Sequence, residues 1–202
     1  MPLFLKENRS VLYMHVPKTG GFAVDSFFRD NGFQLEFFDG GGPRSFNKYR
    51  RCAPQHMHAE QILSLLRLSS IDYIFMTVRD PLARLFSVYK MYARAAVADV
   101  PSLPVWVDRV FRRYLADSYT AENHIRPQAE FWLPTCEIFR QEDGHGSALT
   151  QRIEQKLGIE LKHRTIGTLN KDKDTSIDPA DIEKIAPLVR QFYHRDYLMF
   201  GY

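Results

Sequence analysis

The feature that most constrains the fold is the stretch VLYMHVPKTGGFAVDSFF at residues 11–28. Residues 11–16 form a short apolar run that is typical of a buried β-strand. Pro17, Gly20 and Gly21 interrupt this run, and residues 22–29 then have the composition of a helix. A strand, a glycine-containing loop and a helix in direct succession favour a layered α/β fold.

Strands and helices continue to alternate along the rest of the chain. The sequence predicts further strands at residues 33–38, 73–78 and 135–140, and further helices at residues 59–68, 82–92, 105–115 and 148–157. Asp178 and Pro179 resemble an N-cap and a first helical residue, and predict a final helix that Pro187 should kink or interrupt. This alternation predicts an α/β fold of three layers, in which helices cover both faces of a mainly parallel β-sheet.

Length and composition indicate one folded domain. The chain has 202 residues, of which 45% are hydrophobic and 25% charged, as in an average globular domain. No apolar run approaches the ~18 residues of a membrane span, and the first residues contain no stretch long enough for a secretory signal. Cys52 and Cys136 show no disulfide or metal spacing, and a net charge of +3 is too small to indicate nucleic-acid binding. We therefore expect a cytoplasmic protein with a single domain over residues 1–202, without a membrane span or a nucleic-acid partner.

The loop PKTGG at residues 17–21 has the features of an anion-binding site. Gly20 and Gly21 allow positive φ angles and close approach of a ligand to the backbone. The first N–H groups of the following helix lack intrahelical acceptors and carry partial positive charge, to which Lys18 adds a full charge. An ordinary strand-to-helix turn with a surface lysine is the alternative. Because Lys18 precedes the glycines and Phe22 follows them, the loop lacks the Gly-Lys-Ser/Thr order that binds magnesium ATP.

Three motifs, in chain order, carry a resemblance to a known family. Residues 15–21, HVPKTGG, are similar to a 5′-phosphosulfate loop, residues 77–89, TVRDPLARLFSVY, to a 3′-phosphate motif, and residues 193–202, YHRDYLMFGY, to a family C-terminus. The chain thus resembles sulfotransferases that use 3′-phosphoadenosine 5′-phosphosulfate, above all their carbohydrate branch of Golgi-type and bacterial enzymes. The resemblance implies a P-loop NTPase-like sulfotransferase fold and transfer of a sulfuryl group to a hydroxyl, in this branch that of a saccharide.

The resemblance also implies which residues bind the donor. Lys18 would contact the oxygen between the 5′-phosphate and the sulfuryl group, where negative charge grows as the S–O bond breaks. Arg79 and Ser87 would hold the 3′-phosphate. Phe22 and Ala23 stand where the family usually has hydroxyl residues, which predicts an altered grip on the 5′-phosphate. The implied donor-binding residues are Pro17, Lys18, Thr19, Gly20, Gly21, Phe22, Arg79 and Ser87, together with Asn170 and Lys171 in a loop that returns over the donor.

A general base is expected in the sequence QHMH at residues 55–58, where related sulfotransferases carry His or His-x-His. Histidine has an ordinary pKa near neutrality, so it can take the proton of a hydroxyl as its oxygen attacks sulfur. His58 matches the family's histidine better, and we expect it to be the base with His56 assisting. The alternatives are a surface histidine pair and a metal-binding pair. A third ligand at recognisable spacing is missing, so no metal is expected.

Residues 122–128, ENHIRPQ, resemble a family segment near the acceptor, in which His124, Arg126 and Gln128 would hydrogen-bond a sugar or its acid groups. A loop in ordinary contact with solvent is the alternative. The implied partner is a saccharide or small-molecule acceptor. Two other functions remain open, a non-catalytic nucleotide-binding module of the same fold and a small phosphate-loop kinase. Eukaryotic relatives begin with a membrane anchor, and its absence here implies a bacterial cytoplasmic protein or a trimmed form.

Overall fold

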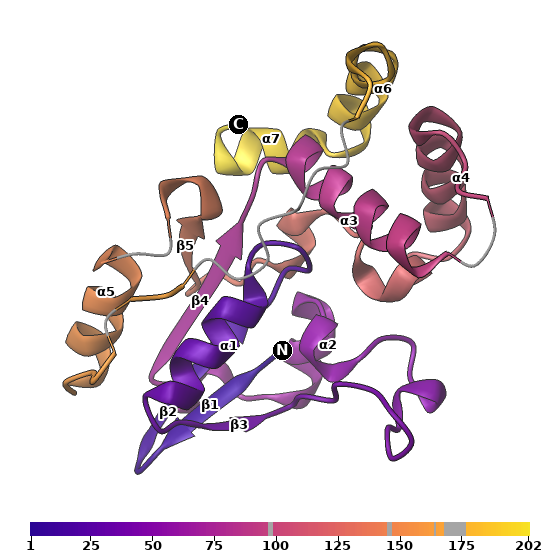
Figure 1. Cartoon of the computed structure of the whole chain (residues 1–202). Helices are drawn as coiled ribbons and strands as arrows, with labels where there is room; N and C mark the ends of the chain where they lie inside the picture. Colours follow the sequence, from indigo (N-terminus) through magenta and orange to yellow (C-terminus); the bar gives the residue numbers. More distant parts are fainter. Residues whose placement is uncertain (97–98, 145–146, 164, 168–176) are drawn as a thin grey trace.

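The computed structural model describes residues 1–96, 99–144, 147–163, 165–167 and 177–202. At its centre is a five-stranded sheet with the strand order β3-β1-β2-β4-β5 (Figure 1). The strands are β1 (Leu3–Lys6), β2 (Arg9–Met14), β3 (Gln34–Glu36), β4 (Tyr73–Val78) and β5 (Glu137–Arg140). The strands expected from the sequence are all present, with ends shifted by a few residues, and β1 is an addition.

The sheet is mixed, which corrects the expectation of a mainly parallel one. β2 pairs with β4 and β4 with β5 in parallel, whereas β1 pairs antiparallel with both β2 and β3. The difference arises because only Glu7 and Asn8 separate β1 from β2, and so short a connection can join only antiparallel strands. β2, β4 and β5, which are separated by helices, form the parallel part.

Helices flank this sheet (Figure 1). They are α1 (Gly21–Asp30), α2 (Ala59–Leu65), α3 (Pro81–Ala95), α4 (Leu103–Ala116), α5 (Ser147–Leu157), α6 (Pro179–Phe192) and α7 (His194–Phe200). Asp178 caps α6 as expected by accepting a hydrogen bond from the Ala180 N–H (2.9 Å), but α6 runs through Pro187 without interruption. The short helix α7 was not expected. Among the helices that the structure describes, none has both the length and the apolar character needed to cross a membrane.

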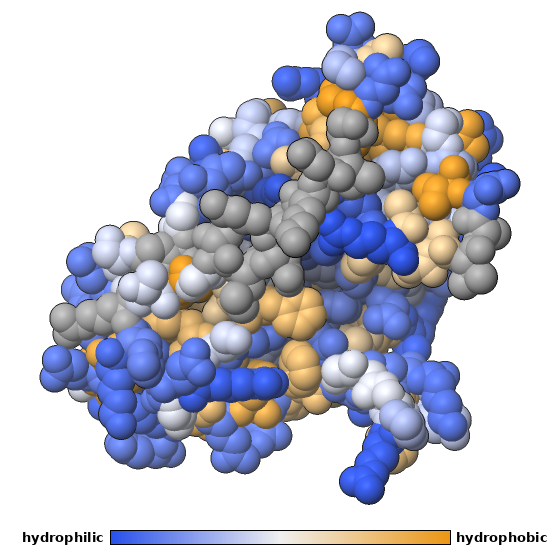
Figure 2. All heavy atoms as spheres, in the orientation of Figure 1, coloured by the Kyte–Doolittle hydropathy of each residue, from blue (hydrophilic) through white to orange (hydrophobic). Residues whose placement is uncertain are grey.

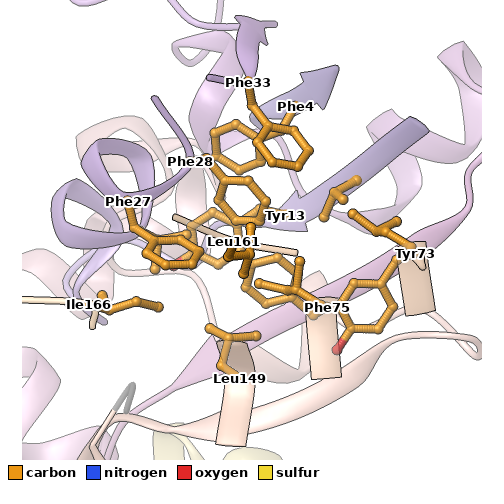
Figure 3. Close-up of a cluster of buried hydrophobic side chains, with 14 of the residues drawn as sticks. Phe4, Tyr13, Phe27, Phe28, Phe33, Tyr73, Phe75, Leu149, Leu161 and Ile166 are labelled. Carbon is orange, nitrogen blue, oxygen red and sulfur yellow. The ribbon is translucent and has the colours of Figure 1, made fainter. Parts of the chain in front are cut away.

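Side chains of β2 and β4 point alternately to the two faces of the sheet, and helices cover both faces. On one face Tyr13 and Phe75 stack with ring centroids 4.8 Å apart and pack among side chains of α1 and α5 (Figure 3). On the other face Met14 and Met76 pack with Ile62 of α2 and with residues just before β5. The expected arrangement of helices on both faces of a sheet is therefore confirmed.

A third apolar cluster joins α3, α4 and α6 (Figure 1). Within it, Phe111 of α4 stacks on Phe192 of α6 with ring centroids 3.8 Å apart, and Tyr193 is fully buried. Figure 2 shows a largely polar face on which apolar side chains gather between these helices and again over α1. The cluster packs α3, which is separated from the end of β4 by two residues, against α4 and α6.

Candidate active site

A cavity of about 520 Å³ lies at the carboxyl ends of β2 and β4. In open α/β sheets, ligands bind in the crevice beyond the carboxyl ends of the strands. The loop between β2 and α1 forms one wall, and Arg79 before α3 together with Ser87 and Met91 within α3 forms another. Of the site residues expected from the sequence, the wall contains Pro17, Lys18, Gly20, Gly21, Phe22, His56, Arg79, Ser87 and His124.

The loop between β2 and α1 presents a lysine and a helix N-terminus to this cavity. Lys18 has a φ of 72°, and Gly20, the N-cap of α1, has a φ of 93°. Glycine adopts this left-handed conformation without the steric cost that other residues bear. The Ala23 N–H donates to the Gly20 carbonyl (3.0 Å). The N–H groups at the very start of a helix have no acceptor within the helix and carry partial positive charge. This wall is therefore suited to an anion.

Thr19 belongs to the same loop but does not reach the cavity. It is fully buried, and its hydroxyl donates to the Val16 carbonyl (2.8 Å) and lies 2.8 Å from the Thr77 hydroxyl of β4. Thr19 is one of the donor-binding residues expected from the sequence, and in this structure its hydroxyl fastens the loop to the sheet.

Phe22 borders the cavity, with 70% of its surface exposed. The ring stands at the rim and does not fill the cavity. Neither Phe22 nor Ala23 offers a hydroxyl, so the polar groups that this part of the wall offers to an anion are Lys18 and the main-chain amides.

Arg79, the first residue after β4, is held by a side chain distant in sequence. The Arg79 N–H donates to Gln128 Oε1 (3.0 Å), and the Arg79 carbonyl accepts from Gln128 Nε2 (2.7 Å). The sequence predicts that Gln128 contacts the acceptor. In the structure, however, Gln128 is fully buried and does not line the cavity, so it is not placed for that contact. Its place in the structure is to fix the backbone from which the Arg79 guanidinium extends.

Ser87 reaches the same cavity from α3. Asp80 caps this helix by accepting a hydrogen bond from the Ala83 N–H (2.7 Å), and Pro81 occupies its first turn, where a missing N–H has no consequence. Ser87 is buried and lies two turns further along. The structure thus brings Arg79 and Ser87 to the cavity that Lys18 lines.

Three histidines from distant parts of the chain form a row in the cavity wall. The rings of His15 and His56 meet edge to face with centroids 5.6 Å apart, and those of His56 and His124 do so at 4.7 Å. Burial lowers the pKa of His15 well below its ordinary value and that of His124 to about 3, so both stay neutral at pH 7. In the described part of the chain, no group of three or more His, Cys, Asp or Glu side chains is arranged to hold a metal ion.

The packing of His15 explains why a glycine stands at position 21. A Cβ atom added to Gly21 would lie 2.0 Å from His15 Nε2, far inside van der Waals contact. His15 also stacks on Tyr13, with ring centroids 5.1 Å apart. Only a glycine therefore lets the loop close over this ring.

His58, the expected base, lies outside the cavity wall. It is the N-cap of α2 and only 5% exposed, and its Nδ1 is 2.7 Å from Gln61 Oε1, which also accepts from the His58 N–H (3.2 Å). Its Nε2 lies 3.6 Å from Glu60 Oε2. Burial and then the nearby Arg126 lower the pKa of His58. These contacts give His58 a structural place at the start of α2.

Arg126 is likewise occupied inside the protein. It is 4% exposed and donates from Nε to Asn123 Oδ1 (2.9 Å), with further bonds to Ser118 (3.0 Å to its hydroxyl) and to Glu130. The structure therefore does not present Arg126 to an acceptor. Asn170 and Lys171, expected near the donor, lie outside the described residues.

Several residues that support the site were not found from the sequence. Arg84 is 1% exposed and donates to the carbonyls of His124 (3.0 Å) and Arg126 (2.8 Å), and the Tyr193 hydroxyl donates to the Ile125 carbonyl (2.8 Å). Both belong to motifs that the resemblance uses, but only the tertiary structure shows that they brace the segment carrying His124.

Asp25 was also missed, because a single aspartate within an amphipathic helix gives no sequence signal. It lies in the cavity wall, is 5% exposed, and its Oδ1 has no hydrogen-bond partner among the described residues. Burial raises the pKa of Asp25 to about 7, against an opposing effect of Arg29. Its protonation therefore changes near neutrality.

A second, more open cavity of about 630 Å³ adjoins the first and shares Phe38 and Gly40 with it. The segment after β3 supplies its other walls, including Arg50, which pairs with Asp39 (2.9 Å). The side-chain amide of Gln55 holds this segment by bonding to both the N–H and the carbonyl of Asp39 (3.1 Å each). A molecule too long for the first cavity can therefore extend into the second.

The fold and the site together define an α/β protein with a ligand cavity at the carboxyl ends of parallel strands, walled by an electropositive loop and a histidine row. A family model described as "Sulfotransferase family" matches residues 1–202. The chain therefore belongs to the sulfotransferase family, whose reaction is sulfuryl transfer. No curated protein and no solved structure matches the chain.

Proposed function

We propose that this protein transfers a sulfuryl group from 3′-phosphoadenosine 5′-phosphosulfate to a hydroxyl of a saccharide. The observation that carries the proposal is that one cavity is lined by Lys18 and the glycine loop, by Arg79 with Ser87, and by His56. These groups come from three separate parts of the chain, and a sulfotransferase needs all three: a site for each end of the donor, and a base.

The residues of the cavity fit such a donor. Its volume of about 520 Å³ lies within the usual range for sites of small ligands. Lys18 and the N-terminus of α1 would bind the 5′ end, while the planar guanidinium of Arg79 suits paired hydrogen bonds to the 3′-phosphate, with Ser87 beside it. When bound, the donor supplies the sulfuryl group and a phosphate leaving group. Lys18 would stabilise the negative charge that develops on the leaving oxygen.

His56 is proposed as the general base, in place of His58. The His56 ring lies in the cavity wall, whereas the His58 ring is engaged with Gln61 outside it. His56 Nδ1 is buried and lies 3.8 Å from Glu122 Oε2, which leaves Nε2 as the ring nitrogen available to an acceptor. Nε2 would take the proton of the attacking hydroxyl as its oxygen bonds to sulfur.

The acceptor is proposed to approach through the second cavity. That cavity meets the first at Phe38 and Gly40 and offers aromatic and charged walls, which suit the apolar faces and polar edges of a sugar.

Ligand titration followed by an activity assay tests this function. 3′,5′-Bisphosphoadenosine should raise the melting temperature far more than magnesium ATP, and the Arg79→Ala variant should lose most of that rise. Arg112→Ala is the matched control, because Arg112 is exposed on α4 and pairs with Asp108 (2.9 Å). Transfer of labelled sulfate to a saccharide panel should then occur with the wild type and fall about 10²- to 10³-fold in Lys18→Ala.

Each alternative function has its own outcome in this test. Preference for magnesium ATP would favour a kinase. Tight binding of the bisphosphate without transfer to any hydroxyl of a broad panel would favour a non-catalytic nucleotide-binding module. Transfer to small alcohols but to no saccharide would refute the proposed acceptor class alone.

A further inference from the structure

Three consecutive residues near the cavity, Ala121, Glu122 and Asn123, adopt left-handed backbone conformations with φ angles of 53°, 51° and 66°. None of them is glycine, and residues with a Cβ atom adopt this conformation rarely. Backbone strain of this kind persists where surrounding contacts enforce it, and it is frequent at functional sites. The contacts that enforce this turn lead to His56.

Both ends of the turn are fastened. Asn123 is fully buried, its side-chain amide donates to the His56 carbonyl (2.9 Å), and its Oδ1 accepts from Arg126 Nε (2.9 Å). At the other end, the Ala121 carbonyl accepts a hydrogen bond from His124 Nδ1 (2.8 Å). The residue held between these contacts is Glu122.

The turn places a carboxylate beside the proposed base. Glu122 Oε2 lies 3.8 Å from His56 Nδ1, which is buried and has no hydrogen-bond partner within the described part of the chain. The distance exceeds that of a hydrogen bond, but contacts in active sites are often long before substrate binds and then tighten. The interaction with His56 lowers the pKa of Glu122, which is therefore ionised at neutral pH.

We propose that Glu122 is a positioning residue that keeps a proton on His56 Nδ1 and so directs the unprotonated Nε2 at the acceptor hydroxyl. The inference rests on the proposed function, because it concerns the same proton transfer. The hydroxyl proton passes to Nε2, the acceptor oxygen bonds to sulfur, and the bond from sulfur to the phosphate oxygen breaks. The imidazolium that forms keeps its other proton on Nδ1, which faces Glu122. The negative charge of Glu122 stabilises this imidazolium.

The other groups around His56 do not supply this charge. The titratable and charged groups that share the cavity wall with His56 are His15, Lys18, Asp25, Arg79, and His124. The two rings that contact His56 stay neutral, because burial lowers the pKa of both His15 and His124. Among the residues that the structure describes, Glu122 is the carboxylate within ion-pair distance of His56.

The inference is tested first without reference to catalysis. In nitrogen NMR spectra of the histidine rings of the full chain, with His56 identified by its loss in His56→Gln, the wild type should show the ring proton on Nδ1. Glu122→Gln should move that proton in part to Nε2, because the carboxylate that faces Nδ1 is gone. Glu60→Gln is the matched control. Glu60 lies 3.6 Å from His58 Nε2, outside the cavity, and its loss should leave the ring proton of His56 where it is in the wild type.

Kinetics of sulfate transfer supply the second readout. Glu122→Gln should lower kcat about tenfold with little change in KM, because Glu122 acts on the orientation of the base and does not contact the substrate. Glu122→Asp, which keeps the charge, should recover part of the loss.

Glu122→Gly separates positioning from folding. Glycine adopts a positive φ readily, so this variant should keep the turn and melt no lower than the wild type. It should nevertheless lose activity as Glu122→Gln does.

The outcomes distinguish this inference from the proposed function. An unchanged position of the His56 ring proton in Glu122→Gln, or full activity of Glu122→Gly, would overturn the positioning role even if the protein transfers sulfate. If the ring proton moves in Glu122→Gln but the wild type transfers no sulfate, the Glu122–His56 pair is upheld and the function proposed for the site is refuted.

Discussion

His56 and His58 are separated by one residue, and each has a glutamate oxygen within 4 Å: Glu122 at 3.8 Å from His56 and Glu60 at 3.6 Å from His58. What differs is the rest of each environment. The His56 ring packs against His15 and His124 in the cavity wall, whereas the His58 ring is taken up by Gln61 at the start of α2. A histidine–carboxylate pair alone therefore does not identify a base. A base is identified by a ring nitrogen that remains accessible to a ligand.

The largest effect expected is on turnover at His56. His56→Ala should lower kcat of sulfate transfer about 10²- to 10⁴-fold, the usual contribution of a general base. His58→Asn is the matched control, since asparagine is a favourable N-cap residue, and it should keep turnover near that of the wild type. Steady-state kinetics of the two variants decide the comparison, and a reversed result would return the role of base to His58.

A pH-dependent effect on stability is expected from Asp25, which lines the same cavity as His56. Its pKa is raised from 3.8 unfolded to about 7 folded. The unfolded chain therefore loses the proton first, and stability should fall as pH rises from about 4 to 7. Asp25→Asn removes this penalty and should increase the free energy of unfolding at pH 8 by up to about 4 kcal/mol.

Urea denaturation at several pH values checks this expectation. The advantage of Asp25→Asn over the wild type should shrink as the pH falls from 7 to 4 and be gone below about pH 3, where the carboxyl is protonated in both states. An advantage of equal size at every pH would show that burial does not perturb this carboxyl.

A smaller loss of stability is expected at Gly21, beside the histidine row. Gly21→Ala drives a methyl group into the His15 ring and should lower the free energy of unfolding by about 1–3 kcal/mol. Gly167→Ala is the control, because a Cβ there meets nothing within 4 Å. In a His15→Ala background the loss should largely disappear, and a loss of the same size would place its cause elsewhere in the loop.

The smallest effect is expected at His58, the histidine that lies outside the cavity. His58→Ala removes the ring bonded to Gln61 and should lower stability by about 1 kcal/mol, the typical effect of losing a helix cap. Thermal or urea denaturation measures this, with Ser64→Ala, on the exposed face of the same helix, as comparison. A loss of several kcal/mol would indicate that His58 supports more than α2.

Most of the fold followed from the sequence, because buried strands and amphipathic helices produce patterns of their own. β1 was missed since four residues at the antiparallel end of the sheet give too short a pattern, and it was this strand that made the sheet mixed. The short helix α7 was missed because its seven residues follow α6 almost without a break.

The site was predictable where its residues are contiguous in sequence. The loop with Lys18 and the Arg79 motif are local patterns, and the structure brings them to one cavity. The orientation of His56 was not predictable, because it depends on a 3₁₀ turn (Pro54–His56) followed by extended residues. Glu122 was not predictable either, since a left-handed turn without glycine leaves no signature in the sequence.

The amide side chain that grips the backbone of Arg79 is itself tied to the far end of the chain. Asp196 of α7 accepts hydrogen bonds from the N–H groups of Gln128 and Ala129 (2.8 Å each). The last helix therefore holds Gln128, which in turn positions the backbone of Arg79. In the proposed function, α7 therefore supports the residue that would bind the 3′-phosphate, without contacting the donor itself. Removal of α7 should then weaken binding at the Arg79 end of the cavity more than at the Lys18 end.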